Sequence, residues 1–144
     1  MRTLALDVGT KTIGVAVSDL LGITANGVTT IMRKDIAHDT AELAKIVAEY
    51  GPGEILVGVP MRADGGVTRR GEEIMKFAAL VKEKFGLPVN FWDESYSTKN
   101  AERFLIEADV SRKKRKKVID KMAAVYILAE YLESKRPITP EDDY

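Results

Sequence analysis

The chain has 144 residues, which suits one compact domain and is enough to build a hydrophobic core. Its 22 basic and 22 acidic residues cancel, which argues against a polyanion binder that works by net charge alone. It has no cysteine, so disulfides, thiolate nucleophiles, zinc–thiolate sites and iron–sulfur clusters are excluded. No apolar run approaches the length of a membrane span, and the N-terminus lacks a long apolar signal region. We therefore expect a cytoplasmic protein with no membrane partner.

The first part of the chain predicts three strands. Residues 3–8 and 12–18 are β-type runs that flank a tight turn at residues 9–11, and a third strand is expected near residues 28–32. Because the connections between these strands are short, we expect all three to be antiparallel neighbours.

The rest of the chain predicts helices that alternate with two further strands. Apolar residues at helical spacing, with glycine, proline or a capping hydroxyl at the ends, predict four helices. These are expected at residues 36–50, residues 74–85, residues 98–108 after a Ser97 or Thr98 cap, and residues 118–134. Strands are expected at residues 54–59 and 89–93, and a glycine-containing loop at residues 61–71.

This order predicts an α/β fold with a five-stranded mixed sheet and helices on both of its faces. We expect a single domain over residues 1–134, followed by a polar C-terminal tail over residues 135–144.

Asp7 is the first residue that suggests chemistry. It lies between Leu6 and Val8 in a run that is typical of a central strand covered on both faces. A buried carboxylate is costly unless a cation, a metal or hydrogen bonds satisfy it. Asp7 could accept hydrogen bonds from the turn amides, or it could have partners from distant parts of the sequence.

Two such partners are available. The Asp93–Glu94 pair ends the last predicted strand, and Asp120 falls on the apolar face of the last predicted helix. Together with Asp7 they would form an oxygen-only cluster of the kind that Mg²⁺ or Mn²⁺ prefers. Two such ions held roughly 4 Å apart can activate water for phosphodiester cleavage. The alternatives are that Glu94 is an ordinary strand-end acid and that Asp120 pairs with Lys116 or Lys117 at a solvated helix start.

Basic side chains could bind a phosphate backbone beside these acids. Charged segments of this kind are also common on solvated surfaces. The candidates are Lys11, Arg62, Arg69, Arg70, Lys99, Arg112, Lys113, Lys114, Arg115, Lys116 and Lys117.

Four segments, LDVGTKTIGVAVSD, VGVPMRADGG, WDES and DKMAAVYIL, occur in an order that resembles the YqgF (RuvX) family. The resemblance extends from Leu4 to about Leu132. It implies an RNase H-like fold, and a function as a Holliday junction resolvase or as a nuclease that matures the 5′ end of pre-16S rRNA. It also implies that Asp7, Glu94 and Asp120 are the catalytic, metal-binding residues.

Two positions depart from the family pattern. Thr12 and Ser95 stand where arginine is common in the family, which removes two potential phosphate contacts. Lys11, Lys99 or Arg69 could compensate for them.

The leading hypothesis from the sequence is a Mg²⁺- or Mn²⁺-dependent endonuclease in which activated water attacks a phosphodiester of structured RNA or branched DNA. One alternative is a non-catalytic nucleic-acid-binding module of the same fold. Another is an ATP-binding phosphotransferase, because the Asp-x-Gly-Thr-Lys hairpin also resembles the phosphate hairpin of sugar kinases and actin-like ATPases. The sequence leaves both a monomer and a homodimer open.

Overall fold

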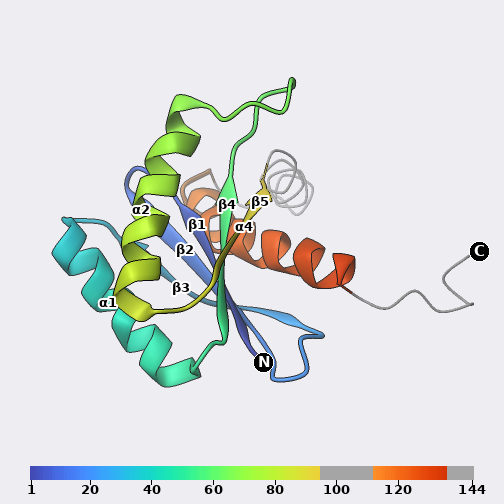
Figure 1. The fold of residues 1–144 in the computed structure, drawn as a ribbon. Coiled ribbons are helices and arrows are strands. Elements are labelled where there is room, and N and C mark those ends of the chain that lie inside the picture. Colours follow the sequence, from blue (N-terminus) through green and yellow to red (C-terminus); the bar gives the residue numbers. More distant parts are fainter. Residues whose placement is uncertain (95–111, 136–144) are drawn as a thin grey trace, which may run out of the picture.

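The protein is built around one five-stranded sheet (Figure 1). The computed structural model describes residues 1–94 and 112–135, with the backbone alone described over residues 112–121. The elements in chain order are β1 (Thr3–Val8), β2 (Thr12–Ser18), β3 (Ala25–Met32), α1 (Ile36–Tyr50), β4 (Glu54–Val59), α2 (Arg69–Phe85), β5 (Val89–Asp93) and α4 (Arg112–Ser134).

The strand order is β3-β2-β1-β4-β5, so β1 lies at the centre of the sheet. The first three strands are mutually antiparallel, whereas β4 pairs parallel with β1 and β5 pairs parallel with β4. The structure thereby confirms the predicted mixed sheet and its antiparallel start.

The two faces of the sheet carry different cores. Side chains alternate along a strand, so Leu4, Leu6 and Val8 point to one face, and they join the core that contains residues of α1 and α2. Ala5 points to the other face and joins a core made with α4. Figure 1 shows α4, in orange to red, crossing the sheet on the side away from α1 and α2.

Small side chains bring α4 close to the sheet. Ala5 pairs with Ala16 across β1 and β2, and both are fully buried. On the helix, Ala123 and Ala124 are also fully buried. Three of these methyl-sized side chains, Ala5, Ala16 and Ala124, belong to the core between the sheet and α4, and they let the helix backbone approach the strands more closely than larger apolar residues would.

A polar network fixes the C-terminal part of α4 to the sheet. Glu54 is buried and accepts hydrogen bonds from the Tyr131 hydroxyl (3.1 Å to each carboxylate oxygen), from Thr3 Oγ1 (2.8 Å) and from Asn90 Nδ2 (3.0 Å). Every donor that the buried carboxylate needs is thus supplied by neighbouring elements.

Trp92 connects β5 to the same helix. Its Nε1 donates to Glu130 Oε2 at 2.9 Å, and its ring meets the Tyr131 ring edge-on at a centroid distance of 5.7 Å. Trp92 is half-buried against the α4 core.

Three predicted boundaries were wrong. The third strand begins at Ala25 rather than near Val28. The segment 61–71 is not a loop throughout, because α2 begins at Arg69, where the Thr68 side chain caps the helix by accepting from the Gly71 amide at 2.9 Å. The last helix begins at Arg112 rather than near Val118, so the basic run is helical. Lysine and arginine are good helix formers, so the charge run does not interrupt the helix.

Other predictions fall outside the described residues. These are the helix expected at residues 98–108 and most of the tail expected at residues 135–144. Within residues 1–94 and 112–135, no helix combines the length and the apolar character needed to cross a membrane.

Candidate active site

Asp7 lies near the C-terminal end of the central strand, on the face that α4 covers. Its register partner on β2 is Gly14, and the last β1–β4 pair is Leu6 with Val57, so Gly58 is the next residue of β4 beside Asp7. The carboxylate is therefore flanked on both neighbouring strands by residues without a side chain. Neither glycine puts a side chain of its own beside Asp7.

Glu94 follows directly after β5 and reaches the same place. Its amide donates to Val59 O at 3.2 Å, and its carboxyl group is in hydrogen-bonding contact with Asp7. Glu94 Oε2 lies over Gly58, since a Cβ built on that glycine would be only 2.7 Å from this oxygen and 2.6 Å from Ile127 Cδ1 of α4. The glutamate is thus enclosed between β4 and the helix.

The structure selects one acid from the Asp93–Glu94 pair. Glu94 is the member whose side chain lies beside Asp7, whereas Asp93 is the last residue of β5 and is exposed. Alternation along the extended chain accounts for this difference, because consecutive side chains point to opposite faces.

The electrostatics of the pair are unfavourable without a cation. Burial, followed by the hydrogen bond and the charge repulsion from Asp7, raises the pKa of Glu94 from 4.5 to about 9, and the positive charge of Arg70 partly opposes this shift. Among the described residues, Glu94 Oε2 is buried and has no hydrogen-bond partner. Two carboxyl groups this close hold a proton between them when no positive charge compensates them.

These features fit a hard divalent cation. The donor set is made of carboxylate oxygens, one of those oxygens is buried without a partner, and the two acids repel each other. Among the side chains that the structure describes, no three His, Asp or Glu residues gather closely enough to form a complete metal site. Asp7 and Glu94 are two parts of the predicted cluster.

The third predicted acid, Asp120, is in α4, as expected, one turn before Ala124. Its side chain lies outside the described residues, so its place in the cluster stays a prediction. Lys99 and Ser95 also lie outside them.

The predicted phosphate-binding residues lie in several places. Lys11 is exposed in the β1–β2 turn, Arg62 is exposed in the loop after β4, and Arg69 is exposed at the start of α2. Residues 112–117 form the first turns of α4, the helix that also carries Asp120. Thr12, the non-arginine position in the first motif, starts β2, and its carbonyl accepts from the Gly9 amide at 2.7 Å.

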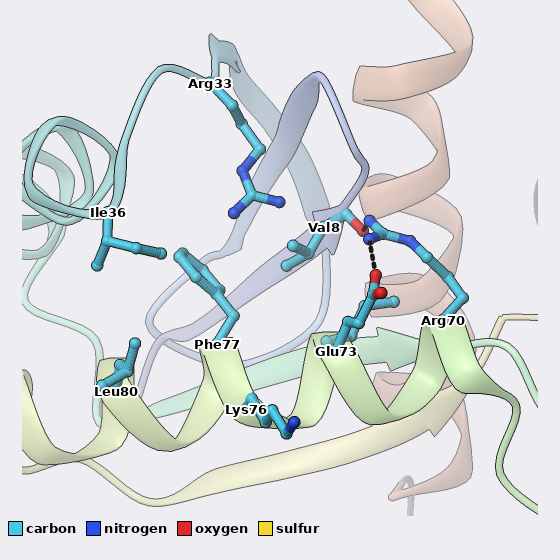
Figure 2. Close-up of a pocket in the computed structure, with 9 residues that line it drawn as sticks. Val8, Arg33, Ile36, Arg70, Glu73, Lys76, Phe77 and Leu80 are labelled. Carbon is cyan, nitrogen blue, oxygen red and sulfur yellow. Dashed lines mark hydrogen bonds and ion pairs between the residues drawn. The ribbon is translucent and has the colours of Figure 1, made fainter.

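Arg70 has internal partners. Its Nη2 donates to Val8 O at 2.6 Å, and its Nη1 forms an ion pair with Glu73 Oε2 at 3.2 Å. Figure 2 shows the guanidinium turned toward the end of β1, with Glu73 beside it.

Sequence reasoning missed Arg33. From the segment between β3 and α1, its Nη1 donates to Gly9 O at 2.7 Å. Arg33 and Arg70 line one cavity of about 230 Å³ next to Val8, on the α1–α2 side of the sheet (Figure 2). Sequence reasoning also gave no part to Gly14 and Gly58. A glycine inside an apolar strand run is a signal that could have identified both.

The sheet order, the antiparallel start and the helices on both faces define an RNase H-like fold. T. thermophilus RuvC in complex with a Holliday junction substrate superposes with a TM-score of 0.60 at 14% identity, covering 94% of this chain and 95% of that one. A fowlpox virus resolvase, solved with its substrate Holliday junction DNA, gives 0.59 at 16% identity, covering 93% and 98%.

Sequence comparison identifies the family. The sequence model of RuvX, described as Holliday junction resolvase, matches residues 1–134, and the chain belongs to this family. A protein of Desulforamulus reducens named "Putative pre-16S rRNA nuclease" is 55% identical over 134 residues, covering 93% of this chain and 98% of that protein. A Geobacillus kaustophilus protein of the same name is 56% identical over 138 residues, covering 94% and 100%.

Proposed function

We propose that the protein is a divalent-metal-dependent endonuclease that cuts structured nucleic acid. The 5′ leader of pre-16S rRNA is the leading candidate substrate. The observation that carries the proposal is the pairing of Asp7, on the central strand β1, with Glu94, which follows the edge strand β5 and whose Oε2 is buried without a hydrogen-bond partner among the described residues. The names of relatives at 55% and 56% identity favour the RNA substrate.

In this proposal Asp7, Glu94 and Asp120 hold Mg²⁺ or Mn²⁺. A cation there would activate water and stabilise the negative charge that develops on the phosphate. Gly14 and Gly58 put no side chain of their own beside Asp7, and the Glu94 carboxylate occupies the space over Gly58. The enclosing helix limits the access of water to the pair, which strengthens its electrostatic interactions.

The basic residues would position the substrate. Exposed cations at Lys11, Arg62 and Arg69 can bind backbone phosphates without reading the base sequence. The α4 segment 112–117 would add further phosphate contacts beside Asp120.

The experiment compares wild-type protein with the Asp7→Asn and Glu94→Gln variants on an RNA that carries the precursor leader. Each is assayed with Mg²⁺, with Mn²⁺ and with chelator. Glu72→Gln, the same chemical change at an exposed position in the first turn of α2, is the matched control. We expect metal-dependent cutting by the wild type and the control, and a loss of at least about 100-fold in both site variants.

RNA binding, measured in chelator, separates catalysis from affinity. Unchanged binding by the site variants, together with lost cutting, supports the proposal. Retained cutting by Asp7→Asn in a nuclease-free preparation would refute the assigned site. Wild-type binding without cutting under any metal would favour a non-catalytic binding module.

A Holliday junction is the second candidate substrate, because the matching family is described as a resolvase. A four-way DNA junction is assayed in the same conditions, and the oligomeric state is measured by light scattering. Symmetric incision of two strands by a dimer would support resolution, since paired cuts need two sites related by symmetry.

A further inference from the structure

Two arginines bind consecutive main-chain carbonyls directly after Asp7. Arg70 Nη2 donates to Val8 O at 2.6 Å, and Arg33 Nη1 donates to Gly9 O at 2.7 Å. The arginines come from different elements, α2 and the segment between β3 and α1, and both side chains extend toward the end of β1 (Figure 2). We call Arg33 and Arg70 the carbonyl clamp.

Each guanidinium of the clamp is oriented by a carboxylate. Arg33 Nε pairs with Asp39 Oδ2 at 3.1 Å, and Asp39 is buried, with 2% of its side chain exposed. Arg70 pairs with Glu73 at 3.2 Å, and Arg33 also lies over the Phe77 ring at 5.0 Å. A planar guanidinium held at two of its nitrogens has little freedom left, so its position fixes that of the carbonyl it binds.

The carboxylates of Asp39 and Glu73 also indicate the role of the carbonyl clamp. Asp39 and Glu73 offset the positive charges of the two arginines, which weakens their attraction for a backbone phosphate. Hydrogen bonds of 2.6 and 2.7 Å from a guanidinium to main-chain carbonyls fix the position of a strand end, which is the role that we assign to these two groups.

The end of β1 needs such support on its β4 side. The parallel register of β1 with β4 runs from Thr3↔Glu54 to Leu6↔Val57, one residue short of Asp7. Beyond that point Val8 O accepts from Arg70. The strand end that carries Asp7 is therefore fixed by side chains where the ladder to β4 stops.

We propose that the carbonyl clamp positions Asp7, holding the end of β1 so that the Asp7 carboxylate faces Glu94 in the geometry that binds the metal. Arg33 and Arg70 act here as positioning residues. The inference rests on the proposed function, because it gives the clamp a role in the same two-carboxylate site.

The test uses Arg33→Lys and Arg70→Lys. Lysine keeps the charge but has no planar fork, so it cannot bind a carboxylate and a carbonyl in the same fixed geometry. The matched control is Arg2→Lys. Arg2 Nη1 also donates to a main-chain carbonyl, that of Tyr50 at 3.3 Å, but it does so at the opposite end of β1.

Three quantities are measured in each variant: the Kd for Mn²⁺ in the absence of substrate, kcat, and KM. We expect the clamp variants to bind Mn²⁺ about 10-fold more weakly, as when groups that orient metal ligands are changed. Their kcat should fall by about 10- to 100-fold, because a small displacement of the Asp7 carboxylate from its productive position slows the reaction strongly. Their KM should stay within about twofold of the wild type, as expected when only an interaction specific to catalysis is lost.

Two results would overturn the inference. One is wild-type Mn²⁺ affinity and kcat in both clamp variants, and the other is a raised KM with unchanged kcat, which would make the arginines substrate ligands. Should Arg33→Lys fail to fold, Arg70→Lys decides the matter alone, since its partner Glu73 is 57% exposed. A wild type that neither binds Mn²⁺ nor cuts would refute the proposed function itself, whereas failure of the variants alone to differ refutes only the clamp.

Discussion

Replacing Gly58 by alanine should damage the site more than the fold. A Cβ at this position would lie 2.6 Å from Ile127 Cδ1, about 0.8 Å inside the 3.4 Å at which ordinary contact begins, and 2.7 Å from Glu94 Oε2. Ile127 is fully buried, so it has no free space to move into. Overpacking of this kind costs about 1–3 kcal/mol.

A second effect opposes that cost. Alanine restricts the unfolded chain, which stabilises a protein by about 0.4–1 kcal/mol where the backbone accepts it. The overpacking is larger, so we expect a net loss of about 0.5–2 kcal/mol in the free energy of unfolding. The easier movement is that of the Glu94 carboxylate, whose displacement separates it from Asp7 and removes metal binding.

The assay combines urea unfolding with Mn²⁺ titration and cleavage at 25 °C, where the variant is still folded. Gly51→Ala is the control. Gly51 ends α1 with φ 56° in open space, so alanine there costs about 1–2 kcal/mol through backbone strain without touching the site. The expected result is a stability loss of similar size in both variants, with Mn²⁺ affinity lost only in Gly58→Ala. Wild-type Mn²⁺ affinity in Gly58→Ala would refute the placement of Glu94 over this glycine.

Three further outcomes are expected. The pKa of Glu94 is raised from 4.5 to about 9, so between these pH values the metal-free folded state binds more protons than the unfolded state. The stability of the metal-free protein therefore falls as the pH rises through this range. Glu94→Gln should raise the Tm in chelator at pH 8 and change it little at pH 4. Tyr131→Phe removes the hydroxyl that donates to buried Glu54, which should cost about 1.5–3 kcal/mol in urea unfolding and leave cleavage unchanged. Burial alone would raise the pKa of Asp39, but hydrogen bonds from neighbouring groups hold that pKa below 3.8, so Asp39 stabilises the protein above this pH and the contribution disappears in stronger acid. Asp39→Asn should lower the urea midpoint at pH 7 and match the wild type more closely as the pH is lowered toward 3.

The sheet was predictable because its signals are local. Apolar runs of strand length, short connections and glycine-marked turns specify the five strands, and the Asp7 run reads as a central strand because both of its neighbours are apolar. The choice between Asp93 and Glu94 was not predictable, since it depends on where β5 ends relative to β4. Composition also could not place the start of α4, because a basic run looks the same on a solvated segment and in a helix.

The carbonyl clamp was beyond sequence reasoning for a different reason. Arg33 and Arg70 bind main-chain atoms 24 and 62 residues away, and a backbone carbonyl leaves no residue-type signature for a pattern to match. Only the fold brings these atoms together. Asp120 is the reverse case, since its residue type and helical position indicate a role while its side chain lies outside the described residues.

The contacts of Trp92 allow its fluorescence to report on the packing of α4 against the sheet. It is the only tryptophan in the chain, and its indole nitrogen and ring both touch α4, through Glu130 and Tyr131. Any loosening of α4 from the sheet would expose the indole to water and shift its emission to longer wavelength. Tryptophan emission recorded while Mg²⁺ or RNA is added would therefore show, without a label, whether α4 moves relative to the sheet on binding. This is the helix that carries Asp120.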